Sequence, residues 1–327
     1  MKMVLPLIAV AAFALATGVQ AQPEPGAAAP PADIESLLRA TDEPAAPAEA
    51  ASPEPPAAEA PPPVPTLKIP PPDMTVGVKR RYRIANTAEV ARGGQTQRRS
   101  NEQVVEIEVV QASPKRIVRY VIVDGSAKDD PTGDALLNAS KGVATDYEAE
   151  ASGKPVRLTE WDKVRATILE RLLLDPTAPL DGAKRTRTVL TAMDGTAAVA
   201  FAVPEMAMMA DMQGWPELPF ATAQEEARTA RFGEHEARLV SRREALAPPA
   251  EQTCVAQLKA ATDLDPASPA AKNLAAALKI QTDAEVSTVD GWVVRMKQVQ
   301  TRLSGPQKEV KTSTIVREDP PACPAPG

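Results

Sequence analysis

Apolar and polar residues alternate with a period of two in the last third of the chain, and this pattern predicts a β-meander. The stretch from Thr282 to Val316 places Asp290-Gly291 between two segments rich in β-branched residues. An Asp-Gly pair is typical of a two-residue type I′ hairpin turn, because its positive φ angles suit Gly and are tolerated by Asp. After Ser304-Gly305-Pro306, a third strand is expected from Val310 to Val316.

The same alternation predicts a second group of antiparallel strands in the N-terminal half. Apolar residues alternate with polar ones at Tyr82, Ile84, Ala88 and Val90. Gly93-Gly94 then turns the chain, and a nearly continuous apolar run from Ile117 to Val123 predicts a central strand. A further hairpin is expected from Thr145 to Leu158, around Ser152-Gly153.

Two of these hairpins share a sequence pattern. Thr145-Asp146-x-Glu148 matches Thr282-Asp283-x-Glu285, and each is followed by Gly-x-x-Val. An internal duplication would divide the folded region into two similar halves, residues 73–203 and 221–318. Short amphipathic hairpins also converge on such patterns without common ancestry, so both explanations stay open.

Helical periodicity predicts helices that cover the sheet. A helix from Thr159 to Leu174, with Thr159 as its N-cap, carries a stripe of four large apolar residues: Trp161, Val164, Ile168 and Leu172. An Ala-rich helix is expected from Ser268-Pro269 to Lys279. Asp194-Gly195 favours a hairpin within 186–203, with a helix as the alternative. The predicted fold class is therefore α+β, an antiparallel sheet of meander hairpins covered by one or two helices.

The N-terminal 72 residues predict an exported protein whose folded region follows a flexible linker. Residues 1–21 carry one early positive charge, an apolar run and Val19-Gln20-Ala21, as a secretory signal peptide does. The apolar run is shorter than the roughly 20 residues of a membrane-spanning helix, so no span is expected after cleavage. Residues 22–72 hold 16 of the 34 prolines and are expected to form a disordered Pro/Ala-rich linker. The folded region is then 73–318, followed by a Pro-rich tail, 319–327.

Charge and cysteine content narrow the expected partners and compartment. The 327-residue chain has a net charge of −6 and little basic clustering, which argues against nucleic acid. Cys254 and Cys323 are its two cysteines. An even number in an oxidising compartment such as the periplasm predicts one disulfide between them. A metal-binding or redox thiol pair is the weaker alternative, because neither cysteine has a partner at CxxC spacing.

Sequence motifs for catalysis are missing. His235 is the one histidine, and the chain has no Gly-x-Ser-x-Gly elbow, no second histidine for a zinc protease helix and no Gly-rich phosphate loop. We therefore expect a protein that is not an enzyme and that uses no cofactor or metal. The alternative is an enzyme whose catalytic carboxylates come from distant sequence positions, as in glycosidases, and meet in a cleft.

The segment from Pro204 to Phe220 is the candidate ligand-binding site. Five of its residues are expected to form an apolar lid: Met206, Met208, Met209, Met212 and Trp215. Methionine adapts to irregular apolar contacts, which suits either a lid or core packing. Because thioethers also bind Cu(I), a copper site that includes His235 is the sharper alternative.

An exported antiparallel sheet with covering helices resembles the periplasmic lipoprotein carriers and related envelope lipid-binding folds. The resemblance extends over about residues 78–316 by strand pattern, without a diagnostic motif, so no functional residue is carried over. One hypothesis is an exported, non-catalytic envelope protein that binds an envelope partner or has a structural role on its tether. The alternative is a periplasmic carrier of a lipid or other apolar ligand, held between the sheet and the helix from Thr159. A carrier needs an apolar cavity on the order of several hundred Å³, whereas a structural domain has a filled core.

Overall fold

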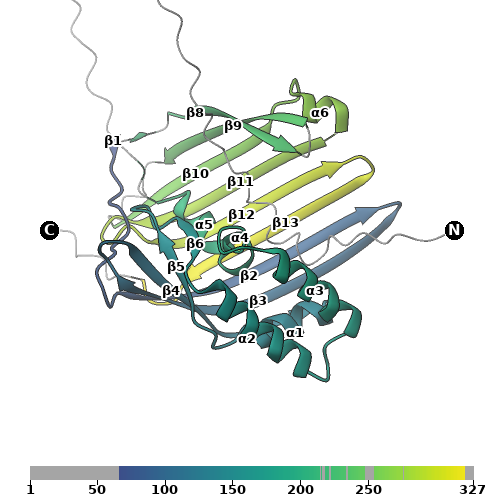
Figure 1. Ribbon diagram of the computed structural model, residues 1–327. Coiled ribbons are helices and arrows are strands. Elements are labelled where there is room, and N and C mark those ends of the chain that lie inside the picture. Colours follow the sequence, from purple (N-terminus) through teal and green to yellow (C-terminus); the bar gives the residue numbers. More distant parts are fainter. Residues whose placement is uncertain are drawn as a thin grey trace, which may run out of the picture. The chain divides into compact units, whose positions relative to one another are not determined.

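One antiparallel sheet dominates the computed structural model of the protein, which describes residues 66–213, 215, 218–220, 222–232, 235–246, 254–274 and 276–320. The sheet has 11 strands in the spatial order β6-β5-β4-β3-β2-β13-β12-β11-β10-β9-β8, and a second sheet pairs β1 with β7 (Figure 1). The strands are β1 (Thr66–Leu67), β2 (Lys79–Arg92), β3 (Gln95–Gln111), β4 (Arg116–Lys128), β5 (Thr145–Ala149), β6 (Pro155–Leu158), β7 (Leu218–Pro219), β8 (Gln224–Phe232), β9 (His235–Leu246), β10 (Val255–Leu264), β11 (Ala276–Ser287), β12 (Val293–Ser304) and β13 (Gln307–Arg317).

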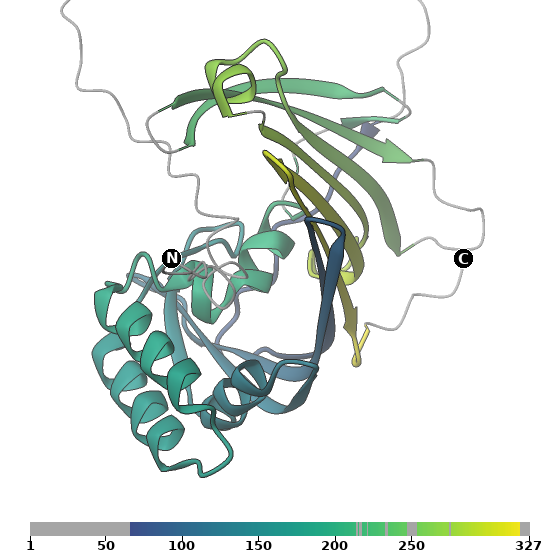
Figure 2. The ribbon, with the colours of Figure 1, turned by 90° about the vertical axis from the view of Figure 1, so that its right-hand side faces the viewer.

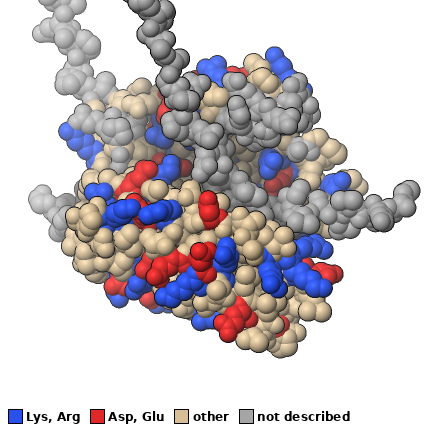
Figure 3. Space-filling view, viewed as in Figure 1, with Lys and Arg blue, Asp and Glu red and all other residues tan. Residues whose placement is uncertain are grey.

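The helices pack on one face of this sheet. They are α1 (Pro131–Ser140), α2 (Trp161–Leu174), α3 (Leu180–Ala192), α4 (Val199–Ala202), α5 (Pro204–Ala210) and α6 (Pro269–Leu274). Figure 2 shows that the sheet is strongly curved and that α4 and α5 lie on its concave side. The main core forms between this face and α1 to α5, and a small second core lies at α6, β9, β10 and β11. Figure 3 shows basic and acidic side chains interspersed over the face seen in Figure 1.

The apolar stripe of α2 is confirmed. Its four large side chains are at most 5% exposed: Trp161, Val164, Ile168 and Leu172. Burying each such side chain contributes about 1.5–3 kcal/mol, so this face attaches α2 to the core. The predicted N-cap is wrong by one residue, because the helix is preceded by Glu160, which makes no capping hydrogen bond. The Thr159 hydroxyl instead donates to the Asp146 carbonyl at 3.2 Å.

The predicted meander at β11, β12 and β13 is confirmed, although its first turn is longer than expected. β11 ends at Ser287 and β12 begins at Val293, so residues 288–292 form the loop. Gly291 has the left-handed conformation, with φ of 70°, and its N–H donates to the Ser287 carbonyl at 3.0 Å. The loop is longer than a type I′ turn, and its Asp290 carboxylate accepts from Arg80, from Arg317 and from the Trp292 N–H.

The strands of the N-terminal half are also confirmed, with β2, β3, β4, β5 and β6 adjacent in sequence order. The hairpin predicted at Asp194-Gly195 is wrong. Asp194 accepts hydrogen bonds from the N–H groups of Thr196 (3.0 Å) and Ala197 (2.7 Å), which starts a helical turn. The Ala-rich helix ends at Leu274 rather than Lys279, because the chain from Ala276 pairs with β10 and β12. The two proposed halves join in one continuous sheet at β2 and β13, and their duplication stays a prediction.

Part of the predicted linker packs against the folded region. Residues 66–72, expected in the linker, include β1 and the buried Ile69. Asp73 follows at once, and its carbonyl accepts from the Trp292 indole at 3.1 Å. Packing against the 288–292 loop thus outweighs the Pro-rich composition. Residues 1–65 and Cys323 lie outside the described residues, so the signal peptide, the linker before 66 and the disulfide of the buried Cys254 stay predictions. Within the described part of the chain, no helix is long and apolar enough to cross a membrane.

Candidate functional site

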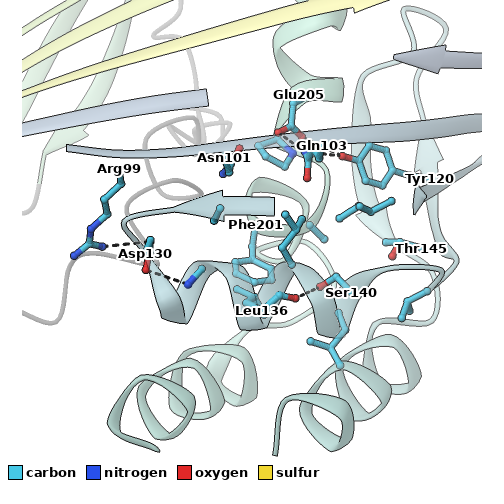
Figure 4. A pocket seen from close by; sticks show the side chains of 18 of the residues that line it. Arg99, Asn101, Gln103, Tyr120, Asp130, Leu136, Ser140, Thr145, Phe201 and Glu205 are labelled. Atoms are coloured by element: carbon cyan, nitrogen blue, oxygen red, sulfur yellow. Dashed lines mark hydrogen bonds and ion pairs between the residues drawn. The ribbon is translucent and has the colours of Figure 1, made fainter. Parts of the chain in front are cut away.

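A cavity of about 160 Å³ lies between the concave face of β3 and β4 and the helices α1, α2, α4 and α5 (Figure 4). Its walls are mainly apolar and include Ile122, Leu136, Leu137, Val143, Ile168 and Phe201. Its polar side chains are separated in space. Figure 4 shows Arg99 and Asp130 at one end, and Glu205, Gln103 and Tyr120 toward the other.

Close packing of α1 on β4 shapes the floor of the cavity. A Cβ atom on Gly125 would lie 2.9 Å from Leu137 Cδ2 and 2.8 Å from the Glu102 carbonyl oxygen, so a side chain at this position would push the helix away. The pairing of β3 with β4 also shifts register between Val104 and Val105, which is a β-bulge beside the cavity. The glycine and the bulge together let α1 lie directly against the sheet.

The inner end of the cavity is a buried cluster around Glu205, the second residue of α5, which is 3% exposed. Gln103 donates through Nε2 to Glu205 Oε1 at 3.1 Å and lies 3.3 Å from the Tyr120 hydroxyl. That hydroxyl donates to Glu205 Oε2 at 3.4 Å. Behind them, Asn86 donates to Glu205 Oε1 at 3.5 Å and to Asn101 Oδ1 at 3.1 Å. Strands β2, β3 and β4 thus hold the carboxyl group in one position.

Burial determines the electrostatics of this cluster. It raises the pKa of Glu205, and hydrogen bonds, including those from Asn86 and Tyr120, oppose that rise only in part. The pKa of Tyr120 is also raised well above its ordinary value, first by burial and then by the neighbouring Glu205 charge. Among the described residues, no Lys or Arg forms an ion pair with Glu205, and its side-chain partners are uncharged. The carboxyl group therefore keeps its proton to a higher pH than an exposed glutamate does.

The outer end of the cavity is charged and partly exposed. Arg99 and Asp130 form an ion pair of 3.5 Å, with side chains 32% and 18% exposed. Asp130 is also the N-cap of α1, because its Oδ1 accepts from the N–H of Gly133 at 3.0 Å. Asp130 therefore caps α1 and also forms part of the outer end of the cavity.

The residues predicted to form a lid are all buried beside the cavity, on or just after α5. Their exposed fractions are 1%, 8%, 0%, 2% and 4% for Met206, Met208, Met209, Met212 and Trp215. They belong to the main core and are not among the residues that line the cavity. The Trp215 indole donates to the Asp211 carbonyl at 2.9 Å, and the Arg243 guanidinium lies 5.6 Å from its ring centroid. Their role as a ligand-binding lid stays a prediction.

Two further features bear on chemistry. No group of three or more His, Cys, Asp or Glu side chains suitable for a metal ion occurs among the described residues. The side chain of His235, part of the alternative copper site, lies outside the described residues. A second depression, of about 230 Å³, is lined partly by Lys259, Asp283, Glu285, Arg295 and Lys297, and it has no buried polar group comparable to Glu205 within the described structure.

Comparison with known proteins gives only distant likenesses. No protein-family model and no curated protein matches this chain. DynF from the dynemicin biosynthesis pathway of Micromonospora chersina is 7% identical, with a TM-score of 0.18 over 79% of this chain and 86% of its own. A DUF1329 family protein from Desulfovibrio piger is 7% identical, with a TM-score of 0.19 over 76% and 89%. An outer membrane lipoprotein-sorting domain from Vibrio parahaemolyticus is 6% identical, with a TM-score of 0.13 over 73% and 84%. TM-scores this low carry no inference about function, which rests on the site itself.

Proposed function

We propose that this chain is a non-catalytic domain that binds a small, mostly apolar ligand in the cavity between β3 and β4 and helices α1, α2, α4 and α5. The observation that carries the proposal is the composition of the cavity, with apolar walls and one buried polar cluster. Pockets for small molecules are typically mostly apolar, with a few placed polar groups that orient the ligand.

The size of the cavity favours a small ligand over a lipid. Its volume of about 160 Å³ lies below the roughly 300–1,000 Å³ of ordinary ligand pockets. An apolar cavity of about 150 Å³ is large enough to hold benzene. The ligand we propose therefore has an apolar part of about one aromatic ring, and the acyl chains considered from sequence are too large for this space.

Toluene binding tests this function directly. We expect toluene to bind the wild-type protein, as measured by chemical-shift changes in a methyl-labelled sample. Ala202→Leu places three more carbon atoms at the cavity wall and should abolish binding. Ala192→Leu makes the same change at an exposed position of α3 and should leave binding intact. Absence of toluene binding to the folded wild type, or equal binding to both variants, would refute the proposal.

A second candidate function, docking to an envelope partner, is favoured by an apolar patch where α2 and α3 meet. Leu173, Leu174 and Leu180 are 56%, 74% and 77% exposed. Exposed apolar clusters beside charged residues mark interaction sites. On α3 the patch is followed by three exposed cations that form no ion pair within the described residues: Lys184, Arg185 and Arg187. The partner we propose is a protein with an apolar groove and an acidic rim.

The docking hypothesis requires a specific loss of binding. One periplasmic protein should be cross-linked to the wild type and to Val76→Ser, an exposed apolar control at 58% exposure, but not to the double variant Leu174→Ser/Leu180→Ser. Rising salt should weaken the complex, because the cations contribute to it. Equal capture by all three proteins, or a complex that consists of two copies of this chain, would contradict it.

A further inference from the structure

We infer that the ligand of this cavity carries a basic nitrogen and that Glu205 is its counter-charge. This inference rests on the proposed function and names its ligand class, a small apolar amine of about one ring or short chain with a single ammonium group. The apolar part would lie against Phe201, Ile168 and Leu136, and the ammonium would face the inner end of the cavity.

The first observation is a buried carboxyl group that the chain does not balance. Glu205 is 3% exposed and lines the cavity. Acidic side chains are almost never fully buried unless they are paired, because an isolated buried charge is costly. Here the side-chain partners are two amides and a phenol, from Asn86, Gln103 and Tyr120. A cation that enters the cavity would complete the pair.

The second observation is that the carboxyl oxygens of Glu205 can accept further hydrogen bonds, whereas the neighbouring amide donors are already used. Both amide hydrogens of Gln103 are directed at Glu205 and Tyr120, and both of Asn86 at Asn101 and Glu205. Each carboxyl oxygen can accept more than one bond. The group that fits this end is therefore a donor with several N–H bonds, as an ammonium is.

The third observation is the distribution of charge along the cavity. The Arg99 guanidinium lies at the outer end, where it pairs with Asp130 at 3.5 Å, and Figure 4 shows both residues away from Tyr120. α2 and α4 contribute the apolar Ile168 and Phe201 to the walls. An amine that enters with its ring on these walls meets no cation at the inner end among the described residues. An anionic ligand would find no cation at that end among the described residues.

Binding of an ammonium couples to proton release from Glu205. In the free protein, burial favours the protonated carboxyl group. The bound ammonium favours the carboxylate, so the carboxyl proton leaves to solvent as the ion pair forms. The other groups around the carboxyl are the uncharged Asn86 and Gln103 and the Tyr120 phenol, with Arg99 and Asp130 farther away at the outer end. Amine affinity should therefore rise with pH until free Glu205 is ionised, provided that the amine stays protonated.

Calorimetric titration with three one-ring probes tests this inference: benzylamine, benzyl alcohol and toluene. We expect the wild type to bind benzylamine about tenfold or more tightly than the two neutral probes, because a buried charge pair contributes at least this much when one partner is lost. Titrations at pH 4.5, the ordinary glutamate pKa, in buffers of different ionisation enthalpy should show proton release with benzylamine and none with toluene. This comparison uses only the wild-type protein.

Glu205→Gln keeps the shape of the side chain and removes its charge. It should weaken benzylamine by about tenfold or more and leave toluene nearly unchanged. Glu170→Gln, at an exposed position of α2, is the matched control and should change neither. If toluene binds but benzylamine gains nothing, or if Glu205→Gln weakens all probes equally, the amine inference is wrong and the proposed function stands. If no probe binds the wild type, both are wrong.

Discussion

Replacing Asp290 should weaken the fold measurably, because its carboxylate links three distant parts of the chain. Its Oδ2 accepts from Arg80 Nη2 at 3.0 Å and from Arg317 Nη1 at 2.9 Å. The three side chains are 11%, 15% and 3% exposed for Asp290, Arg80 and Arg317. The carboxylate thus ties the 288–292 loop to β2 and β13, strands that meet in the middle of the sheet. Asp290→Asn preserves the shape and the acceptor for the Trp292 N–H, which lies 3.3 Å from Oδ1, and removes the charge.

The expected loss follows from burial. Removing one partner of a buried ion pair costs about 3–5 kcal/mol when the remaining charge has no compensation. Arg317 keeps one partly exposed partner, because its Nε lies 3.4 Å from Asp319 Oδ1. Since Asn keeps one oxygen toward the arginines and the loop contact, we expect about 3 kcal/mol, the low end of that range. Domains are stabilised by about 5–15 kcal/mol in total, so the variant should still fold.

Urea denaturation followed by tryptophan fluorescence measures this loss as a change in the free energy of unfolding. Asp283→Asn, at an exposed position of β11, is the matched control and should stay within about 0.5 kcal/mol of wild type. The double variant Asp290→Asn/Arg317→Met should recover part of the loss, because it removes one of the uncompensated charges. A loss below about 1 kcal/mol in Asp290→Asn would mean that this cluster behaves as an exposed ion pair, and the reasoning from burial would be refuted.

Three further predictions concern the helices and the cavity. Leu172→Ala should lower the free energy of unfolding by about 2–5 kcal/mol, because Leu172 is 1% exposed. Leu173→Ala should lower it by about 0.5 kcal/mol or less, because Leu173 is 56% exposed. Similar losses in the two variants would mean that a different face of α2 packs on the sheet. Gly125→Ala should cost about 1–3 kcal/mol, because the new methyl group would lie 2.8 Å from the Glu102 carbonyl oxygen and 2.9 Å from Leu137 Cδ2. An unchanged melting temperature would contradict the close packing around Gly125. The raised pKa of Glu205 means that the folded state holds a proton that the unfolded state releases, so its contribution to stability falls as pH rises from the ordinary 4.5 through the folded value. The stability of wild type minus that of Glu205→Gln should decline over this window, and a constant or rising difference would show that the carboxyl is not buried as described.

Sequence patterns correctly predicted turns and strands where the local conformational preference of the residues agrees with the tertiary structure. Gly93-Gly94 has left-handed φ angles of 58° and 80° in the turn between β2 and β3, as its composition requires. Asp194-Gly195 has the same sequence as Asp290-Gly291 but a different structure. Asp194 starts a helical turn. A Cβ atom on Gly195 would lie 2.7 Å from the Leu158 carbonyl oxygen. Such a close approach depends on a distant part of the chain, and a dipeptide pattern does not contain it.

The candidate site was harder to foresee. Glu205 stands after Pro204 in an apolar run, where an acid in the first turn of a helix is ordinary. The available signal was an acid directly before the run of methionines that was predicted to form a lid. Its burial depends on Gln103 and Tyr120, which come from strands about a hundred residues earlier, with sequence separations of 102 and 85. Glu205, which lines the cavity, therefore lies one residue before Met206, the first residue of the predicted lid.

The pairing of β2 with β13 has a consequence for how the protein folds. They are the first and last long strands of the described chain, and they pair in the middle of the sheet, where Ile84 lies opposite Ile315. Contacts between distant residues form slowly, because a long loop must close before they give any stability. Until β13 is in place, β2 and β12 each present an unpaired edge that can recruit another chain. A chain truncated before Gln307 should therefore aggregate rather than form a smaller stable fold. We expect the pairing of β13 with β2 and β12 to complete the sheet.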